Sequence, residues 1–290
     1  MLEERGLISI DARRAGSFDH SGASMAAKPR VTCARGVIRI DHAAAKAAAT
    51  VRRGTTQHFV VSYDSALGAD GGALADAVLA RCEADYATLQ GWFGGITPPN
   101  LPFQVLVTTD DTGAYHFSCA GTELFIGGKS ASSGNTDFIL SLVVAEEDEV
   151  FEAASGKGWD CGASNGEGLS RVLANDLYPG AEPANFVSAP VWLDEPGRPD
   201  FVNQTDPTDT NYVSIGCAVL FLNWLRFQLG YSWQQIIAAG AATLAEVYHS
   251  LTGRTDGIAR FKTQLQTNYP EGTPSGLTTD QPYPLPGLPA

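Results

Sequence analysis

Short apolar runs in the first part of the chain predict strands and one helix. Residues 73–92 carry apolar side chains at helical spacing, and the glycines at 68–72 before them indicate a turn. Three runs are rich in β-branched and aromatic residues and are bounded by turn-forming positions, which is typical of strands. These runs are residues 57–63, 104–108 and 123–126.

Longer apolar segments dominate the remainder and predict helices. The segments are residues 137–154, 165–177, 213–229, 233–239, 244–251 and 258–266. Residues 183–210 are rich in Pro, Asp and Asn and are predicted to be a loop. Since strands come early and helices late, the pattern predicts an α+β fold with a small mixed sheet followed by a helical C-terminal half.

This pattern divides the chain into four parts. Residues 1–30 form a disordered or loosely packed arm, and Met25 is a candidate natural start within it. Residues 31–180 form the strand-and-helix half, and residues 181–269 the helical half. Residues 270–290 are a Pro- and Gly-rich tail that we expect to lie across the surface or to be disordered.

Charge and hydropathy narrow the classes of partner. The formal net charge of −13 and pI near 4.7 argue against binding to nucleic acid or to anionic membranes. No apolar run reaches the roughly 18–20 residues of a membrane span, and the N-terminus lacks the basic and apolar regions of a signal peptide. We therefore expect a soluble protein, cytoplasmic or secreted without a recognisable signal peptide. A peptide or carbohydrate substrate remains open, and the oligomeric state is not indicated.

The cysteines form no metal-binding or disulfide pattern. The chain has five of them, widely spaced and without a CxxC pair. We expect most of them to be buried reduced thiols, with one bridge left open.

Five acids crowd one predicted helix. Glu146, Glu147, Asp148, Glu149 and Glu152 fall within seven residues, flanked by apolar positions on both sides. Like charges at helical spacing repel, and burial increases the cost. If the acids lie near the core, a cation, basic partners or a proton held at raised pKa must compensate them. A solvated acidic helix face is the alternative.

A further glutamate opens the next predicted helix. Glu167 lies between Gly166 and Gly168, where glycine allows another backbone to come close and where a carboxylate is favoured by the helix N-terminus. Asn165 is a candidate N-cap, and Glu167 itself a candidate capping residue. Arg171 follows at i+4 and is expected to pair with Glu167.

Together these segments resemble the zincin-like peptidases of the gluzincin, or peptidase MA, type. Residues 145–149 (AEEDE) align with the HExxH motif on the active-site helix of that family, and residues 165–168 (NGEG) with its NEG-type motif. Residues 214–225 are similar to the helix that commonly follows, so the resemblance covers about residues 55–255. The chain departs from the family at Ala145 and Glu149, which replace both histidine ligands, and its five histidines form no HxxxH pair.

The resemblance implies a hydrolase with an atypical carboxylate site. Glu146 matches the general base of the family and Glu167 its third metal ligand. Glu149 with Glu167 would bind a divalent ion, and oxygen ligands favour Ca²⁺, Mg²⁺ or Mn²⁺ over Zn²⁺. Tyr212 is a candidate oxyanion donor. The candidate substrate-binding residues are Trp159, Asn165, Asp209 and Asn211. For the loop before residue 213, an ordinary Asx-capped turn is the alternative.

Other interpretations remain open. Loss of both histidines favours a non-catalytic zincin-like binding protein without metal. A glycoside hydrolase could use two of the carboxylates as acid and base or nucleophile, with Trp159, Trp192, Tyr212 and Trp233 as exposed rings that stack on sugars. Residues 162–166 spell GxSxG, but the nucleophile elbow needs a preceding buried strand, and these residues follow a predicted loop.

Overall fold

A mixed five-stranded sheet forms one side of the molecule. The computed structural model describes residues 50–110, 113–129 and 136–287, so the predicted arm, Met25 and Cys33 lie outside the described residues. The strand order is β1-β2-β3-β5-β4. Strands β2, β3 and β5 are mutually parallel, whereas β1 and β4 run antiparallel to their neighbours at the two edges. The strands are β1 (Thr50–Thr55), β2 (Phe59–Asp64), β3 (Phe103–Thr108), β4 (Ala114–His116) and β5 (Glu123–Gly127).

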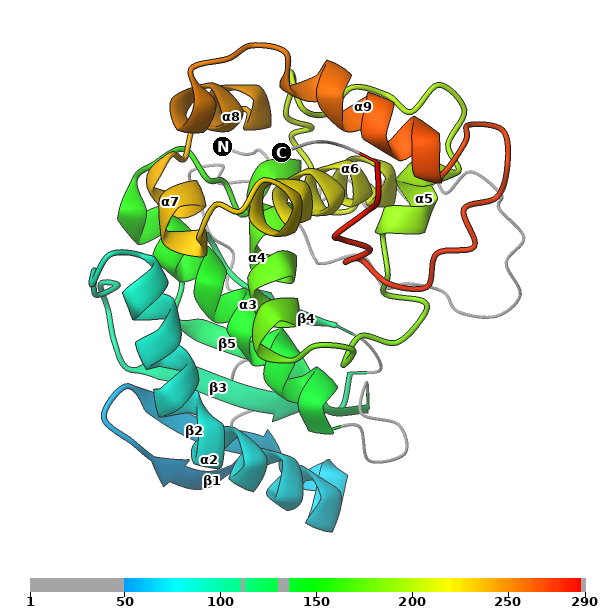
Figure 1. Cartoon of the computed structure of the whole chain (residues 1–290). Helices are drawn as coiled ribbons and strands as arrows, with labels where there is room; N and C mark the ends of the chain where they lie inside the picture. Colours follow the sequence, from blue (N-terminus) through cyan, green and yellow to red (C-terminus); the bar gives the residue numbers. More distant parts are fainter. Residues whose placement is uncertain (1–49, 111–112, 130–135, 288–290) are drawn as a thin grey trace, which may run out of the picture.

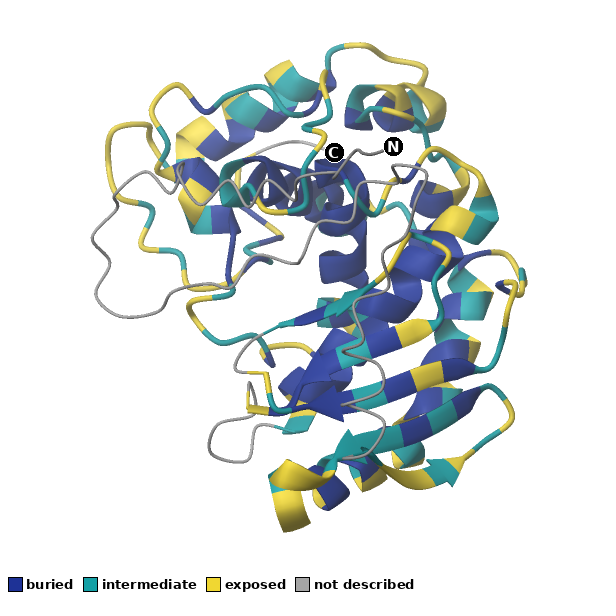
Figure 2. Ribbon diagram, turned by 180° about the vertical axis from the view of Figure 1, so that it is seen from behind, coloured by how far each residue is buried: buried dark blue, intermediate teal, exposed yellow. Residues whose placement is uncertain are grey.

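Two long helices, α2 (Gly68–Trp92) and α3 (Thr136–Ser155), lie across the same face of this sheet (Figure 1). Alternate residues of β2 and β3, among them Phe59 and Val105, are buried, and the alternation is visible from behind (Figure 2). The predicted α+β class is therefore confirmed. Each inner strand supplies one apolar face, and the two helices cover it.

The predicted turn at residues 68–72 is wrong, because these residues begin α2. A short 3₁₀ helix at Ser65–Leu67 leads into them. At Gly71 a β-carbon would come within 3.0 Å of both Leu67 and the Tyr63 ring, so glycine here permits tight packing of the helix start on β2.

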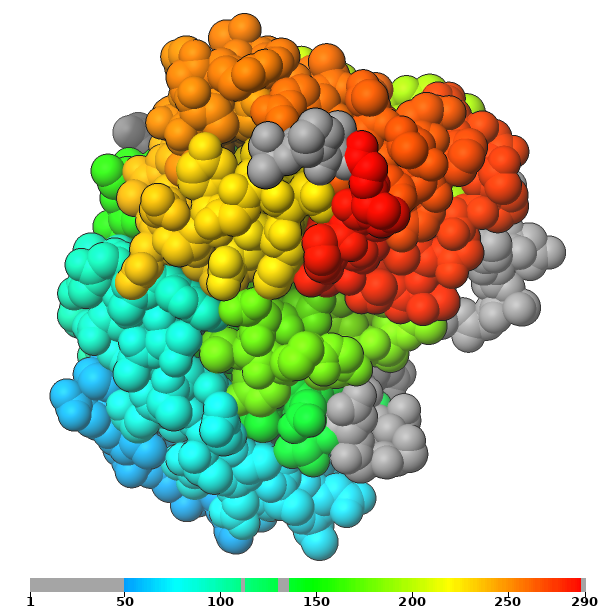
Figure 3. All heavy atoms as spheres, in the orientation of Figure 1, coloured from blue at the N-terminus to red at the C-terminus, as the bar shows by residue number. Residues whose placement is uncertain are grey.

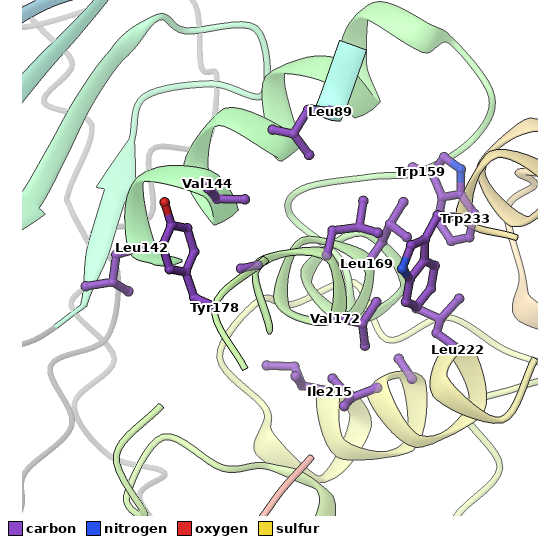
Figure 4. Packing of buried hydrophobic residues seen from close by; sticks show 14 of the residues in the cluster. Leu89, Leu142, Val144, Trp159, Leu169, Val172, Tyr178, Ile215, Leu222 and Trp233 are labelled. Carbon is purple, nitrogen blue, oxygen red and sulfur yellow. The ribbon is translucent and has the colours of Figure 1, made fainter. Parts of the chain in front are cut away.

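Helix α4 (Ser164–Leu177) joins the two halves, because it packs between α3 and α6 (Tyr212–Asn223). Figure 4 shows Leu169 and Val172 of α4 beside Ile215 and Leu222 of α6. One π-helical turn continues α6, and an unpredicted helix interrupts the predicted loop at residues 183–210. The remaining helical elements are α5 (Ala189–Leu193), the π turn η3 (Trp224–Gln228), α7 (Trp233–Ala238), α8 (Leu244–Thr252) and α9 (Gly257–Asn268).

A single hydrophobic cluster joins the two halves. It extends from Phe59 of β2 to Leu285 near the C-terminus and includes most of α3, α4 and α6. Among the described helices, none combines the length and apolar character that crossing a bilayer would require.

The described part of the C-terminal tail, residues 270–287, packs against the helical half. Figure 3 shows the red terminal segment lying on the yellow and orange helices. Tyr283 is 5% exposed, and the buried Asp280 accepts hydrogen bonds from the backbone N–H groups of Ser188 and Ala189 at the start of α5. The tail thus supplies two N–H groups at a helix start with the acceptor they need.

The start of α4 fits tightly against the preceding loop and α3. A β-carbon on Gly166 would lie under 3.0 Å from the backbone of Asp160 and 2.5 Å from Glu152 Oε2. The glycine expected to allow close backbone approach therefore does so.

We expect Gly166→Ala to lower the free energy of unfolding by about 1–3 kcal/mol, because overpacking outweighs the helix preference for alanine. Gly162→Ala is the matched control, since its β-carbon would meet nothing nearer than Asp160 Oδ1 at 3.5 Å. Urea denaturation of both variants measures the difference. Equal stability of the two variants would contradict the close-packing argument.

Candidate functional site

The five clustered acids of α3 point into the interior. Glu147 and Asp148 are 0% exposed, Glu152 1%, and Glu146 and Glu149 2% each. Helices α2 and α4 and strands β4 and β5 all contact α3, and together they cover the acids. This excludes the solvated acidic face and leaves the question of what compensates the buried charge.

His116, the last residue of β4, contacts two of these carboxylates. Its Nδ1 lies 2.8 Å from Glu146 Oε2 and 3.5 Å from Glu149 Oε2, and the three side chains are each 3% exposed. The Nε2 atom of the same ring is buried without a hydrogen-bond partner. The sequence does not indicate His116 as a site residue, because the HxxxH pattern identifies only histidines on one helix. This imidazole comes from the edge strand β4.

Arg171 compensates Glu167. Its Nε donates to Glu167 Oε1 at 2.9 Å across one helical turn, so the predicted i, i+4 pair is confirmed. The guanidinium also donates to the carbonyl of Phe186 and lies 4.9 Å from the centre of the Tyr212 ring. Burial works against the charge on Arg171, but Tyr212 and Glu167 outweigh it and raise the pKa of the guanidinium above its ordinary value.

The other three acids have raised pKa values. Burial raises the pKa of Asp148 to about 8 and raises the pKa values of Glu147 and Glu152 well above their ordinary range. Asp148 and Glu152 lie one turn apart, and the negative charges of Asp148 and Glu149 also raise the pKa of Glu152. The helix therefore combines two of the three expected means of compensation, basic partners and raised pKa values.

Ser170 links the two helices. Its hydroxyl lies within hydrogen-bonding distance of both Glu149 Oε1, at 3.4 Å, and the carbonyl of Glu167, at 3.2 Å. The site thus draws on three elements: β4 with His116, α3 with Glu146 and Glu149, and α4 with Glu167.

A disulfide borders this group. Cys119, three residues after His116, is bonded to Cys161 in the loop between α3 and α4. Cys82 and Cys217 are buried and free. The single bridge that the sequence left open is therefore present, between the loop after β4 and the loop before α4.

The tryptophans expected to be exposed are not. Trp159, Trp192 and Trp233 are at most 5% exposed, and the indole of Trp159 donates to the carbonyl of Ile237. They cannot stack on a sugar at the surface. Trp159 instead fixes the loop between α3 and α4 onto α7.

Two polar residues predicted for the site have structural bonds. Asn165 is not the N-cap of α4, because Ala163 holds that position, and its amide donates to the carbonyls of Gly158 and Ala241. Asn211 caps α6 by accepting from Val213 N, as the alternative of an Asx-capped turn anticipated.

The remaining predicted residues lie beside Arg171 or in the loop before α6. The Tyr212 hydroxyl accepts from Arg171 Nη2 at 3.4 Å, which brings it to the Glu167 end of the site. Asp209 is half-buried in that loop. Ser164 of the GxSxG pattern follows a loop and not a strand, and its hydroxyl accepts from Asp206 N.

Comparison of the chain with models of protein families, with curated proteins and with solved structures gave no significant match. The site is therefore interpreted from its own geometry.

The raised pKa values predict a stability that depends on pH. A carboxyl with a pKa raised by folding contributes stability below its ordinary pKa of 3.8, and that stability is lost as the pH rises toward about 8 for Asp148. In this interval each such carboxyl lowers the free energy of unfolding by about 1.4 kcal/mol for each unit that the pH rises. We expect Glu152→Gln, whose amide can donate to Asp148, to raise the free energy of unfolding by about 1–3 kcal/mol at pH 8 and to leave it unchanged at pH 4.

Urea unfolding at both pH values tests this. Glu123→Gln, on the exposed side of β5, is the control and should change neither value. A gain for Glu152→Gln that is the same at both pH values would show that the carboxyls do not retain protons.

The Glu167–Arg171 pair predicts a strong energetic coupling. Arg171→Met should lower the free energy of unfolding by about 3–5 kcal/mol, because Glu167 would remain buried without this cation. The double variant with Glu167→Gln should recover part of the loss. A double-mutant cycle measured by urea unfolding gives the coupling energy, and a value near zero would contradict the assigned pairing.

Proposed function

We propose that the protein is a hydrolase on a zincin-like scaffold, with His116, Glu146, Glu149 and Glu167 as its site. The observation that carries the proposal is the placement of His116 Nδ1, 2.8 Å from Glu146 and 3.5 Å from Glu149. An imidazole is thus supplied from the edge strand to the helix positions that lack the two histidines of the HExxH pattern.

The order of elements supports the scaffold. A mixed sheet with an antiparallel edge strand precedes α3, a short loop follows, and α4 begins with the Glu167 motif. This is the sequence of elements that the resemblance to the gluzincin type implies. The close fit of α4 against α3 at Gly166 brings the two acidic segments together.

The donor set suits a divalent cation. Glu149 and His116 are the strongest ligand candidates, because Arg171 already binds Oε1 of Glu167, and the buried Nε2 of His116 has no partner. Carboxylate oxygens with one imidazole favour Mn²⁺, Mg²⁺ or Ca²⁺. When bound, such an ion would polarise a carbonyl and lower the pKa of water.

The side chains themselves supply the proton chemistry. Glu146 can accept a proton from an attacking water, and His116, whose Nδ1 lies 2.8 Å from Glu146 Oε2, fixes the orientation of that carboxylate. Tyr212, held by Arg171, can donate its hydroxyl hydrogen to a developing oxyanion beside Glu167. Low exposure excludes bulk water from these groups and strengthens their interactions.

The test begins with the cation. We expect Mn²⁺ to raise the melting temperature of the purified full chain, with about 2.7 kcal/mol of stabilisation at a hundredfold excess over Kd. Glu149→Gln should abolish this shift. Hydrolysis is then screened with fluorogenic peptide and quenched-protein substrates, and Glu146→Gln should lower kcat/KM by about 10²–10⁴-fold.

A second His–Glu pair provides the matched control. His58 Nδ1 lies 2.8 Å from Glu83 Oε2 in a half-exposed position away from the site, so Glu83→Gln should leave cation binding and turnover unchanged. Equal effects of Glu83→Gln and Glu146→Gln would refute the assigned role of Glu146.

A non-catalytic binding protein is the second candidate. The observation in its favour is that Glu146 and Glu167 already pair with His116 and Arg171. It predicts neither a cation-dependent melting shift nor turnover in the same experiments. The glycosidase alternative has lost its stacking platform, because Trp159, Trp192 and Trp233 are buried.

A further inference from the structure

The disulfide beside the site brings soft ligands close to hard ones. His116, Glu149 and Cys161 each present one ligand atom, and these atoms lie within 4.8 Å of one another. Cys161 is bonded to Cys119, which also has the Asp160 carboxylate within 3.9 Å. Both cysteines are half-buried, so a reductant can reach the bond.

A second observation concerns the same imidazole. The Nε2 atom of His116 is buried, the side chain is 3% exposed, and no hydrogen-bond partner satisfies this nitrogen. An unsatisfied buried polar atom is costly, and ring nitrogens of histidine are common metal ligands. The carboxylates of Glu149 and Asp160 add negative charge that favours a cation there.

We propose that reduction of the Cys119–Cys161 disulfide creates a zinc site, with Cys119, Cys161, His116 and Glu149 as its four ligands. Two thiolates with one imidazole and one carboxylate suit Zn²⁺, which prefers tetrahedral coordination by sulfur, nitrogen and oxygen. While the bridge is intact its sulfurs are not thiolates and bind zinc poorly. The redox state of one bond therefore decides whether a soft metal binds.

Reduction of the Cys119–Cys161 disulfide requires a two-electron reductant, such as a dithiol or a phosphine. A dithiol gives two electrons and two protons to the disulfide, which becomes two thiols while the dithiol becomes a cyclic disulfide. A phosphine does the same and becomes a phosphine oxide with oxygen from water. Zinc then replaces the two thiol protons, which pass to solvent.

This inference does not depend on the proposed hydrolase. The two sites share His116 and Glu149, so zinc in the reduced protein would draw His116 away from Glu146. Binding of Mn²⁺ to the oxidised protein tests the hydrolytic site, whereas binding through thiolates in the reduced protein tests this one. Either can fail alone.

The experiment uses Co²⁺ as a spectroscopic probe on the full chain, oxidised or reduced with a phosphine under anaerobic conditions. The reduced protein should bind one equivalent with the near-ultraviolet charge-transfer band of cobalt thiolate and the intense visible bands of tetrahedral cobalt. Zn²⁺ should displace it, and zinc affinity should be at least about 100-fold higher than for the oxidised protein. Absence of the thiolate band after reduction, with the fold intact by circular dichroism, would overturn the proposal.

Variants assign the ligands. Cys161→Ser should remove the thiolate band at one equivalent, and His116→Gln should weaken zinc binding about 10–100-fold. Cys82→Ser and His58→Gln are matched controls from outside the group and should change nothing. The comparison of reduced with oxidised wild-type protein needs no substitution. It therefore tests the proposal even if a variant fails to fold. Loss of the band in Cys82→Ser with retention in Cys161→Ser would refute it.

Discussion

The close contact between α3 and the start of α4 is the constraint on which the rest of the structure depends. It requires a residue without a side chain at Gly166, because the backbone of Asp160 and the carboxyl of Glu152 occupy the space that a β-carbon would take. Gly168 makes a similar contact with Ala218 of α6 on the opposite side. These two contacts place Glu167 in the interior, with acids of α3 on one side and an apolar helix on the other. An acidic stretch that would be solvated at a surface is here buried among apolar side chains.

The protein compensates that charge in two ways. Where a basic side chain is at hand, the carboxylate is paired with it, as Glu167 is with Arg171 and Glu146 with His116. Where none is, burial raises the pKa, as at Glu147 and Asp148. The first group lies toward β4 and α4 and includes Glu146 and Glu167, two of the acids to which we assign chemistry. The second group, Glu147 and Asp148, lies where α3 packs on its neighbours. Its raised pKa values favour neutral carboxyl groups, which lowers the cost of burying them.

Much of the fold could be predicted from the sequence, because hydrophobic spacing determines which faces are buried. The strands β2, β3 and β5 and the helices from α3 to α9, except α5, follow from such spacing within a few residues. Strand β1 (TVRRGT) has no apolar alternation, and β4 has three residues, so neither gives a pattern to detect. The local propensity of the glycines at the start of α2 indicates a turn. Their helical conformation depends on packing against Tyr63, a tertiary contact that local propensity does not reflect.

The sequence predicts only part of the site, because local spacing reveals neighbours on one helix but not contacts between distant elements. Glu146, Glu149 and Glu167 were recognisable as acids placed among apolar residues, and Arg171 as a partner at helical spacing. His116 was not, because a three-residue edge strand brings it to α3 from 30 positions earlier in the chain. Nor could the burial of the tryptophans be read from composition, since ring size alone does not distinguish a core residue from a binding platform.

The C-terminal segment has a consequence for how the molecule is made. Asp280 provides the acceptor for the start of α5, Asn223 of α6 donates to the carbonyl of Asp280, and Tyr283 and Leu285 complete the apolar cluster. Asp280 lies 57 positions after Asn223 along the chain. During synthesis the start of α5 therefore lacks this acceptor, and part of the apolar cluster stays open, until residues 280–285 have been translated and packed.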